Sequence, residues 1–281
     1  MNRFLTVSEL KAGIDSAKTV GFVPTMGALH WGHISLVEMS KSMCDITVVS
    51  IFVNPTQFND RNDYNRYPRD IEADCQMLEE AGCDLVFIPS EKEIYPQPDT
   101  RIFDFGLLDK VMEGLFRPGH FNGVAQVVSR LFDIINPDMA FFGQKDFQQT
   151  VIIKEMVRQL NIPTKIIVAP IVREANGLAM SSRNKLLMPE NRENASLIHE
   201  AMMLATEFVP NIEVKKVKDT ISTIISKSAT LKVEYIEIVD GETLQPISRW
   251  TDANDIYICV AVYAGKIRLI DNLRINPFEP C

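Results

Sequence analysis

The sequence lacks most of the marks of secreted and membrane proteins. Its five cysteines are odd in number and show neither CxxC pairs nor the spacing of a disulfide framework, which favours a reducing compartment. No apolar run approaches the roughly 20 residues of a membrane span. The N-terminal segment MNRFLTVSELKAG lacks the apolar core of a signal peptide. We therefore expect a cytoplasmic protein that associates with no membrane.

Positive charge is also scarce. The 29 Lys and Arg residues are outnumbered by 37 Asp and Glu, which gives a formal net charge of -8, and no basic stripe runs along the chain. A broad surface for nucleic acid or membranes would need such a stripe. We expect no nucleic-acid partner, and any phosphate site must be a local one.

Internal repeats, low-complexity tracts and long Gly/Ser linkers are absent as well. The chain does have 46% hydrophobic residues, ample for a buried core, and its 281 residues lie between one large domain and two ordinary ones. A composition break at REANGLAMSSRN, residues 173–184, indicates a short hinge near 173–180. We predict an N-terminal domain at 1–175 and a C-terminal domain at 176–281.

Short β-rich runs alternate with helical patterns through the first domain. Strands are predicted near 19–23, 45–53, 83–89, 138–143 and 164–170, and helices near 33–44, 68–82, 124–135 and 147–160. Such alternation is typical of βαβ units. It indicates the α/β class, with a Rossmann-like, doubly wound parallel sheet.

The second domain has a different pattern. Helices are predicted at 191–208 and 214–228, followed by strands at 232–240 and 255–273. The last stretch has an Ala-Gly-Lys turn between two apolar runs, so we expect an antiparallel hairpin there. We predict a smaller C-terminal α+β domain.

Two histidines flank Gly32 in VPTMGALHWGH, where the first predicted strand gives way to a helix. This is the carboxyl edge of the sheet, where open α/β sheets bind ligands. A helix N-terminus offers unpaired N–H groups to a phosphate, and imidazoles three residues apart can donate to the same anion. His30 and His33 therefore predict a phosphate site, against the alternative of two histidines that only complete a turn. Their charge state does not follow from the pattern.

Two later segments carry further phosphate-binding side chains. In FGQKDFQQ, residues 142–149, Lys145 and Asp146 are expected to open a helix, and a lysine there can reach a phosphate as a point charge. Of the glutamines that follow, only one should face the site, because neighbours point about 100° apart on a helix. In MSSRN, residues 180–184, two hydroxyls and the Arg183 guanidinium can clamp phosphates, with a serine-rich helix cap as the alternative.

One look-alike differs from these segments. MSKS, residues 39–42, resembles the lysine-bearing loop that class I aminoacyl-tRNA synthetases pair with an H-x-G-H motif. Lys41 follows His33 in the same predicted helix, about 12 Å along it, so it should not double back onto the phosphates. We expect Lys41 on a solvated helix face.

Several motifs together resemble one family. PTMGALHWGH, SIFVNPTQF, YPRD, RPGHFNGVAQVV, FFGQKDFQQ and LAMSSRN are similar in order and spacing to the pantothenate synthetases (pantoate–β-alanine ligases) of the H-x-G-H nucleotidyltransferase superfamily, over nearly the whole chain. The resemblance implies condensation of (R)-pantoate with β-alanine through a pantoyl-adenylate, consuming ATP with Mg²⁺ present and releasing AMP and pyrophosphate. It also implies a homodimer joined through the N-terminal domains and a C-terminal lid domain.

The resemblance also assigns site residues. It makes His33 the proton donor beside His30, Lys145 and Arg183, gives pantoate to Gln57 and Gln149, and links Asp74 with Mg²⁺. The residues that it assigns to ATP are Met26, Gly27, Ala28, Leu29, His30, Trp31, Gly32, His33, Gly143, Gln144, Lys145, Asp146, Val172, Met180, Ser181, Ser182 and Arg183. Trp31 departs from the family, which more often has a polar residue there, and should point outward.

Two other functions stay open at this point. One is a nucleotidyltransferase of the same superfamily that acts on another small acceptor, and the other is a nucleotide sensor without catalysis. The pair Gln57 and Gln149 favours the ligase over the nucleotidyltransferase. Turnover in the presence of both acids would separate the ligase from the sensor. The sequence shows no Cys-His or Ser-His-Asp arrangement that would call for covalent catalysis.

Overall fold

The computed structural model describes residues 1–58, 64–65 and 67–276. Internal contacts divide the chain into two compact units. Unit 1 consists of Met1–Phe105, Phe116–Gln144 and Gln149–Pro170, and unit 2 consists of Gly106–Leu115, Lys145–Gln148 and the chain from Ile171 onward. Each unit has its own sheet and its own hydrophobic core.

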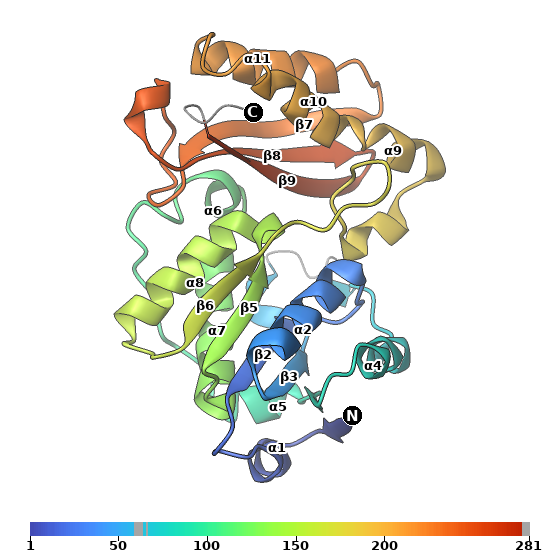
Figure 1. The fold of residues 1–281 in the computed structure, drawn as a ribbon, viewed down its shortest axis with the longest axis vertical. Helices are drawn as coiled ribbons and strands as arrows, with labels where there is room; N and C mark the ends of the chain where they lie inside the picture. Colours follow the sequence, from blue (N-terminus) through green and yellow to red (C-terminus); the bar gives the residue numbers. More distant parts are fainter. Residues whose placement is uncertain (59–63, 66, 277–281) are drawn as a thin grey trace. The chain divides into compact units, whose positions relative to one another are not determined.

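Unit 1 is built on a six-stranded sheet in the order β1-β4-β3-β2-β5-β6, and every pair in it is parallel (Figure 1). Its strands are β1 (Asn2–Phe4), β2 (Val20–Thr25), β3 (Ile46–Ile51), β4 (Leu85–Phe87), β5 (Met139–Gly143) and β6 (Lys165–Ala169). The order runs outward from β2 through β3 and β4, then restarts at β5 and β6. The β2–β5 pair is therefore the switch point of a doubly wound sheet, which confirms the predicted fold class.

Helices cover both faces of this sheet. Val23 of β2 lies in one apolar cluster with Val37 and Leu78, whereas its neighbour Phe22 meets the ring of Phe132 at a centroid distance of 6.1 Å. Because successive strand residues point to opposite faces, these helices lie on opposite sides of the sheet. Among the described residues, the helices of this part are α1 (Val7–Gly13), α2 (Trp31–Met43), α4 (Ile71–Glu80), α5 (Glu91–Ile94), α7 (His120–Ile135) and α8 (Phe147–Gln159).

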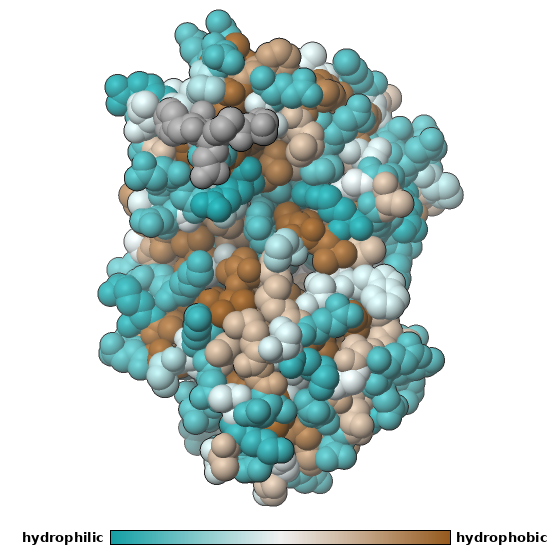
Figure 2. Space-filling view, viewed as in Figure 1, coloured by the Kyte–Doolittle hydropathy of each residue, from teal (hydrophilic) through white to brown (hydrophobic). Residues whose placement is uncertain are grey.

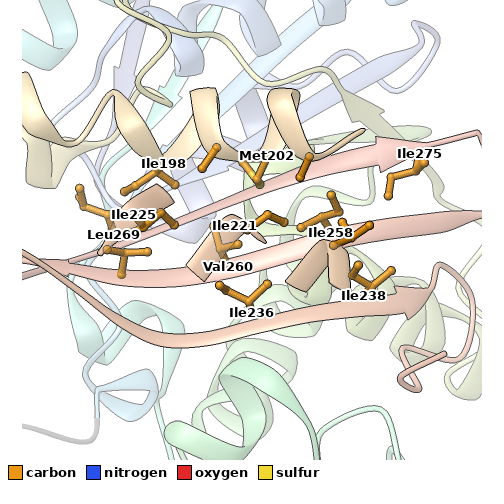
Figure 3. Packing of buried hydrophobic residues seen from close by; sticks show 14 of the residues in the cluster. Ile198, Met202, Ile221, Ile225, Ile236, Ile238, Ile258, Val260, Leu269 and Ile275 are labelled. Atoms are coloured by element: carbon orange, nitrogen blue, oxygen red, sulfur yellow. The ribbon is translucent and has the colours of Figure 1, made fainter. Parts of the chain in front are cut away.

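Unit 2 has a three-stranded antiparallel sheet in the order β7-β8-β9, formed by β7 (Leu231–Asp240), β8 (Ile256–Ala264) and β9 (Ile267–Ile275). Strands β8 and β9 form the predicted hairpin, closed at Gly265 with φ 59°. Its helices include α9 (Pro189–Asn194), α10 (Leu197–Thr206) and α11 (Val214–Ile225). Apolar side chains of α10 and α11 pack against apolar side chains of the sheet (Figure 3). The residues labelled there are Ile198, Met202, Ile221 and Ile225 of the helices and Ile236, Ile238, Ile258, Val260, Leu269 and Ile275 of the strands.

The helix predicted at 191–208 is wrong in one respect, because the chain forms two helices there, α9 and α10. Between α9 and α10 the hydrogen bonding changes from the i−4 pattern of an α-helix to the i−3 pattern. Ser196 N–H bonds to the Glu193 carbonyl at 3.3 Å, and its hydroxyl bonds to the same oxygen at 2.7 Å. Such local serine bonds compete with the regular helix ladder. A second correction concerns Lys145 and Asp146, which lie in the 3₁₀ turn η2 (Gln144–Asp146) directly before α8.

Hydrophilic residues occupy much of the viewed surface of each unit, with smaller apolar areas among them (Figure 2). None of the helices in the described part of the chain is long and apolar enough to cross a membrane. The four cysteines that lie within the described ranges, Cys44, Cys75, Cys83 and Cys259, are free thiols. Burial raises the pKa of Cys83 to about 12, so this thiol stays protonated and unreactive.

Candidate functional site

The turn between β2 and α2 contains two consecutive residues with left-handed backbone. Gly27 has φ 79° and Ala28 has φ 51°. A Cβ on Gly27 would lie 2.8 Å from Oδ2 of Asp74 and 3.1 Å from Cγ2 of Ile51. Both the conformation and the space at this position therefore favour glycine. The turn leads directly into the N-terminus of α2, where backbone N–H groups have no helical partner.

Asp74 of α4 holds this turn through both of its carboxylate oxygens. Oδ2 accepts from Ala28 N–H at 2.9 Å, and Oδ1 accepts from Leu29 N–H at 2.7 Å. Asp74 is 3% exposed, and hydrogen bonds to a buried carboxylate are among the stronger ones. The structure thus shows Asp74 as a support of the turn, a part that the sequence did not predict.

The two histidines lie side by side at the start of α2. His30 is the N-cap residue, and its Nδ1 accepts from Gly32 N–H at 3.1 Å. Its ring centroid is 4.1 Å from that of His33. Because Nδ1 of His30 accepts, a neutral His30 carries its proton on Nε2. Trp31 between them is 64% exposed, so it points outward as predicted.

Gln57 lies beside the same β2–α2 turn in space. It lies in the 3₁₀ turn η1 (Pro55–Gln57), is buried, and places its amide nitrogen 2.8 Å from the sulfur of Met26. Asn54 Nδ2 lies 3.4 Å from the Gln57 amide oxygen. Unit 1 therefore brings together two residues, Met26 and Gln57, that the family resemblance assigned to different ligands.

His120 fixes the backbone of Gln57, and the sequence prediction missed this. Its Nδ1 lies 2.8 Å from the Gln57 carbonyl oxygen, and its Nε2 lies 3.3 Å from the guanidinium of Arg117. A carbonyl only accepts and a guanidinium only donates, so Nδ1 carries the proton and Nε2 accepts. Close packing adds to this contact, because a Cβ on Gly123 would lie 2.5 Å from the Thr56 carbonyl oxygen. The sequence shows the motif RPGHFNG, but it gives no sign that the histidine of this motif contacts the Gln57 carbonyl.

The adjacent glutamines of α8 have different surroundings. Gln148 is buried in unit 2, where its amide donates to the carbonyls of Leu108 and Val111 and accepts from Glu113 N–H. It therefore holds the loop before α6 (Met112–Phe116). Gln149 belongs to unit 1 and is half-buried.

Lys145 and Asp146 form a loose ion pair in unit 2. Nζ of Lys145 lies 3.6 Å from Oδ1 of Asp146, and their side chains are 20% and 49% exposed. At Gly143, where β5 ends, a Cβ would meet no described atom within 4 Å, so packing does not demand glycine there. The backbone at Gly143 is therefore open to the close approach of a ligand.

The loop from Val172 to Arg183 is a short hairpin in unit 2. Met180 N–H bonds to the Val172 carbonyl at 3.0 Å, and Arg173 and Ala179 form a β-bridge. Ser181 caps the 3₁₀ turn η3 (Ser182–Leu186) by accepting from Arg183 N–H at 3.3 Å. The predicted alternative of a serine cap is therefore observed. The same hairpin joins Val172 to the segment from Met180 to Arg183, and the resemblance assigned both to ATP.

The described residues do not form a protein cage for a metal. No group of three or more His, Cys, Asp or Glu side chains in the described ranges is placed to hold a metal ion. Asp74, the position linked with Mg²⁺, uses both oxygens on the β2–α2 turn. Mg²⁺ in nucleotide sites is often held by few carboxylates together with substrate phosphates. These residues fit a metal that arrives on a nucleotide better than one held by Asp74.

The chain matches the family model described as pantoate-beta-alanine ligase over residues 2–274. It is 51% identical over 273 residues to the pantothenate synthetase of Bacteroides thetaiotaomicron, covering 96% of this chain and 97% of the relative. The pantothenate synthetase of Porphyromonas gingivalis ATCC 33277 is 50% identical over 278 residues, with coverage of 98% and 99%.

Solved structures agree with these relatives. The crystal structure of pantothenate synthetase from Thermus thermophilus has a TM-score of 0.94 and 42% identity, covering 99% of this chain and 100% of that chain. The structure of pantoate-beta-alanine ligase from Francisella tularensis, complexed with beta-gamma ATP and beta-alanine, has a TM-score of 0.80 and 39% identity, with 97% of each chain covered. From the family match, the sequence identity and the shared fold, the chain belongs to the pantoate–β-alanine ligase family.

Proposed function

We propose that this chain is a ligase that condenses (R)-pantoate with β-alanine to pantothenate, converting ATP to AMP and pyrophosphate. Support comes from the family match over residues 2–274 and from a relative solved in complex with beta-gamma ATP and beta-alanine. One observation carries the assignment: the buried amide of Gln57 contacts Met26, in the turn that leads into the histidine pair. A carboxylic acid held by Gln57 would therefore lie close to the turn that receives the nucleotide.

The first step joins pantoate to the nucleotide. The pantoate carboxylate attacks the α-phosphorus of ATP, a P–O bond forms, and pyrophosphate leaves to give a pantoyl-adenylate. Negative charge grows on the phosphate oxygens, so the protein must chiefly supply prearranged donors. We assign this role to His30, His33, Lys145 and Arg183, with His33 as proton donor.

The second step forms the amide. The amine of β-alanine attacks the carbonyl carbon of the adenylate, AMP leaves with the electron pair of the broken C–O bond, and the amine loses a proton. Neutral amides suit the first substrate, because Gln57 and Gln149 can orient a carboxylate without locking it in an ion pair.

The nucleotide contacts follow the segments described above. We assign the β2–α2 turn, Met26 to His33, and the β5–α8 turn, Gly143 to Asp146, to the phosphates and ribose. Val172 would contact adenine, and Met180 to Arg183 would cover the triphosphate. The open backbone at Gly143 supports this assignment, since it allows the close approach that phosphate oxygens need.

Four further features belong to the same proposal. They are Mg²⁺ carried on the ATP phosphates, a homodimer joined through the N-terminal part, a cytoplasmic location, and a division into a nucleotide- and pantoate-binding domain at 1–175 and a lid domain at 176–281. When bound, Mg²⁺ would neutralise charge on the phosphates. The rival nucleotidyltransferase is not favoured, because the curated relatives at about 50% identity are pantothenate synthetases.

Isotope exchange tests the assignment. Protein with ATP, Mg²⁺ and pantoate, but without β-alanine, should exchange labelled pyrophosphate into ATP, and omission of pantoate should abolish the exchange. Adding β-alanine should then release AMP and pantothenate in equal amounts. A nucleotide sensor would show no exchange, and a nucleotidyltransferase would leave AMP on its acceptor. Exchange that requires β-alanine would rule out the adenylate-first order.

A further inference from the structure

Strand β9 carries two adjacent buried polar residues, Asp271 and Asn272, which are 5% and 2% exposed. Neighbouring residues of a strand point to opposite faces of the sheet. Asp271 shares its face with Leu269 and Ile275, which pack into the core under α10 and α11. Asn272 therefore points to the other face. One strand thus presents polar groups to two different segments of unit 2.

Asn272 holds the turn that contains Lys145. Its side-chain N–H donates to the Lys145 carbonyl oxygen at 3.0 Å, across a separation of 127 residues. The turn η2 is only three residues long, so its own backbone bonds do little to fix it. The contact with β9 therefore sets where the Lys145 backbone lies, and with it the origin of the lysine side chain.

Asp271 holds the Val172–Arg183 hairpin through Arg173. The two carboxylate oxygens of Asp271 meet the two terminal nitrogens of Arg173 at 2.6 and 3.0 Å, a bidentate pair. The same guanidinium donates to the Gly177 carbonyl at the tip of the hairpin at 3.0 Å. Arg173 follows Val172 directly, so the ion pair ties the base and the tip of the hairpin to the strand.

The two contacts are also joined to each other. Asn272 N–H donates to Oδ1 of Asp271 at 2.8 Å, and the Arg173 guanidinium reaches the Asn272 carbonyl at 3.4 Å. A displacement of β9 would therefore move the Lys145 turn and the hairpin together. Asp271, Asn272 and Arg173 are not among the residues that we assign to the reaction.

We propose that Asp271 and Asn272 are positioning residues that keep the Lys145 turn and the Val172–Arg183 hairpin in a fixed relation, so that both can engage one ATP molecule. This inference rests on the proposed function, which assigns both segments to the nucleotide. It predicts a specific defect toward ATP and none toward pantoate, whose assigned contacts, Gln57 and Gln149, lie in unit 1.

The variant Asn272→Ala tests the first contact. Pyrophosphate exchange should show KM for ATP raised by about three- to tenfold, which corresponds to the loss of one net hydrogen bond. KM for pantoate should stay unchanged. The matched control is Asn194→Ala, since Asn194 also makes a side-chain hydrogen bond in unit 2, to Thr230 at 3.1 Å, but touches neither segment. Asn272→Ser keeps a polar group in the buried site and carries the comparison if the alanine variant does not fold.

The second contact is tested by a double-mutant cycle of Asp271→Asn and Arg173→Gln. Each single variant should raise KM for ATP, and the double variant should cost less than the product of the two fold-changes. Unchanged KM for ATP in the Asn272 and Asp271 variants overturns the proposal. So does a fall in kcat that follows a lower Tm with all KM values unchanged, because that is a purely structural loss. Absence of exchange in the unsubstituted protein would instead contradict the proposed function, and this inference would fall with it.

Discussion

The segments that we assign to the nucleotide are held in different ways in the two units. In unit 1 the β2–α2 turn is shaped by its own backbone, by the N-cap His30, and by one buried carboxylate, Asp74. In unit 2 the Lys145 turn and the Val172–Arg183 hairpin are tied to β9 by side chains that lie 98 to 127 residues away in sequence. The unit 1 turn is a local motif with one distant support, whereas the unit 2 segments add contacts with the distant strand β9 to their own local hydrogen bonds.

This difference has energetic consequences. Backbone conformation and packing fix the geometry of the unit 1 turn. A substitution of the exposed Trp31 should therefore have little effect on stability. The unit 2 segments depend on an ion pair in which Asp271 is buried. Removing one member of such a pair leaves an uncompensated charge, which costs more than the pair contributes. We therefore expect ligase activity to be sensitive to residues of unit 2 that touch no ligand.

The largest effect should come from Lys145→Ala. On the proposed function this lysine stabilises charge on the transferring phosphates, and loss of such a donor typically lowers kcat by about 10²–10³. Folding should be almost unaffected, since Nζ pairs with half-exposed Asp146 at 3.6 Å, an ion pair that contributes little. Steady-state kinetics and thermal unfolding measure the two effects, with the exposed Lys216→Ala as the control. Kinetics equal to those of the unsubstituted protein would remove Lys145 from the site.

Asp74→Ala should have the next largest effect, and on stability as well as activity. It leaves the buried N–H groups of Ala28 and Leu29 without their acceptor, and each such loss costs about 1–3 kcal/mol of unfolding free energy. Urea unfolding measures this, with Glu72→Ala as an exposed control on the same helix. Full recovery of activity by excess Mg²⁺ would show that Asp74 is a metal ligand and that its support of the turn is secondary.

A smaller effect concerns pH. His199 of α10 faces the tip of the hairpin, since its ring would lie 3.0 Å from a Cβ on Gly177. Burial, and then the nearby Arg173 charge, lower the pKa of His199, while Asp271 opposes them in part. The folded state therefore favours neutral His199, and its contribution to stability is present above about pH 6.5 and lost as pH falls below that value.

The variant His199→Gln checks this pH effect. Thermal unfolding of the unsubstituted protein should show Tm falling as pH drops below about 6.5. The glutamine variant, which cannot titrate there, should lose less Tm over the same interval. An equal loss in both proteins would assign the acid sensitivity to other groups and would leave the hairpin without a titrating neighbour.

The same contrast between the two units sets what the sequence could predict. The strands β2 and β3 and the turn before α2 were predicted, because continuous apolar runs, glycines and a helix start are local patterns. β1 and α1 were not predicted: β1 is three residues long and shows no periodicity, although Thr6 and Glu9 form a capping box that signals the start of α1.

The supports of the site could not be predicted, because they depend on where distant elements meet. His120 lies 63 residues from Gln57, and no local pattern indicates that its ring reaches the Gln57 carbonyl. In the sequence, Asp74 looks like an ordinary exposed carboxylate in the first turn of a helix. Only the folded chain shows that it accepts hydrogen bonds from Ala28 and Leu29. Sequence patterns therefore indicated which groups can meet a phosphate, whereas the side chains that hold those groups became visible only with the fold.

The smallest effect is expected for Lys41→Ala, and it tests whether the MSKS segment is more than a look-alike. Lys41 lies in the last turn of α2, and its Nζ is 3.5 Å from Oδ2 of Asp84 with both side chains more than a third exposed. An exposed pair of this kind contributes about 0–1 kcal/mol, so Tm should shift by no more than a few degrees. Pyrophosphate exchange should keep its kcat and its KM for ATP, because Lys41 lies about two helical turns from the histidines and pairs with Asp84. A loss of activity close to that of Lys145→Ala would mean that the lysine acting on the phosphates comes from unit 1. The phosphate-binding lysine would then belong to the locally built segment and not to the turn that β9 holds in unit 2.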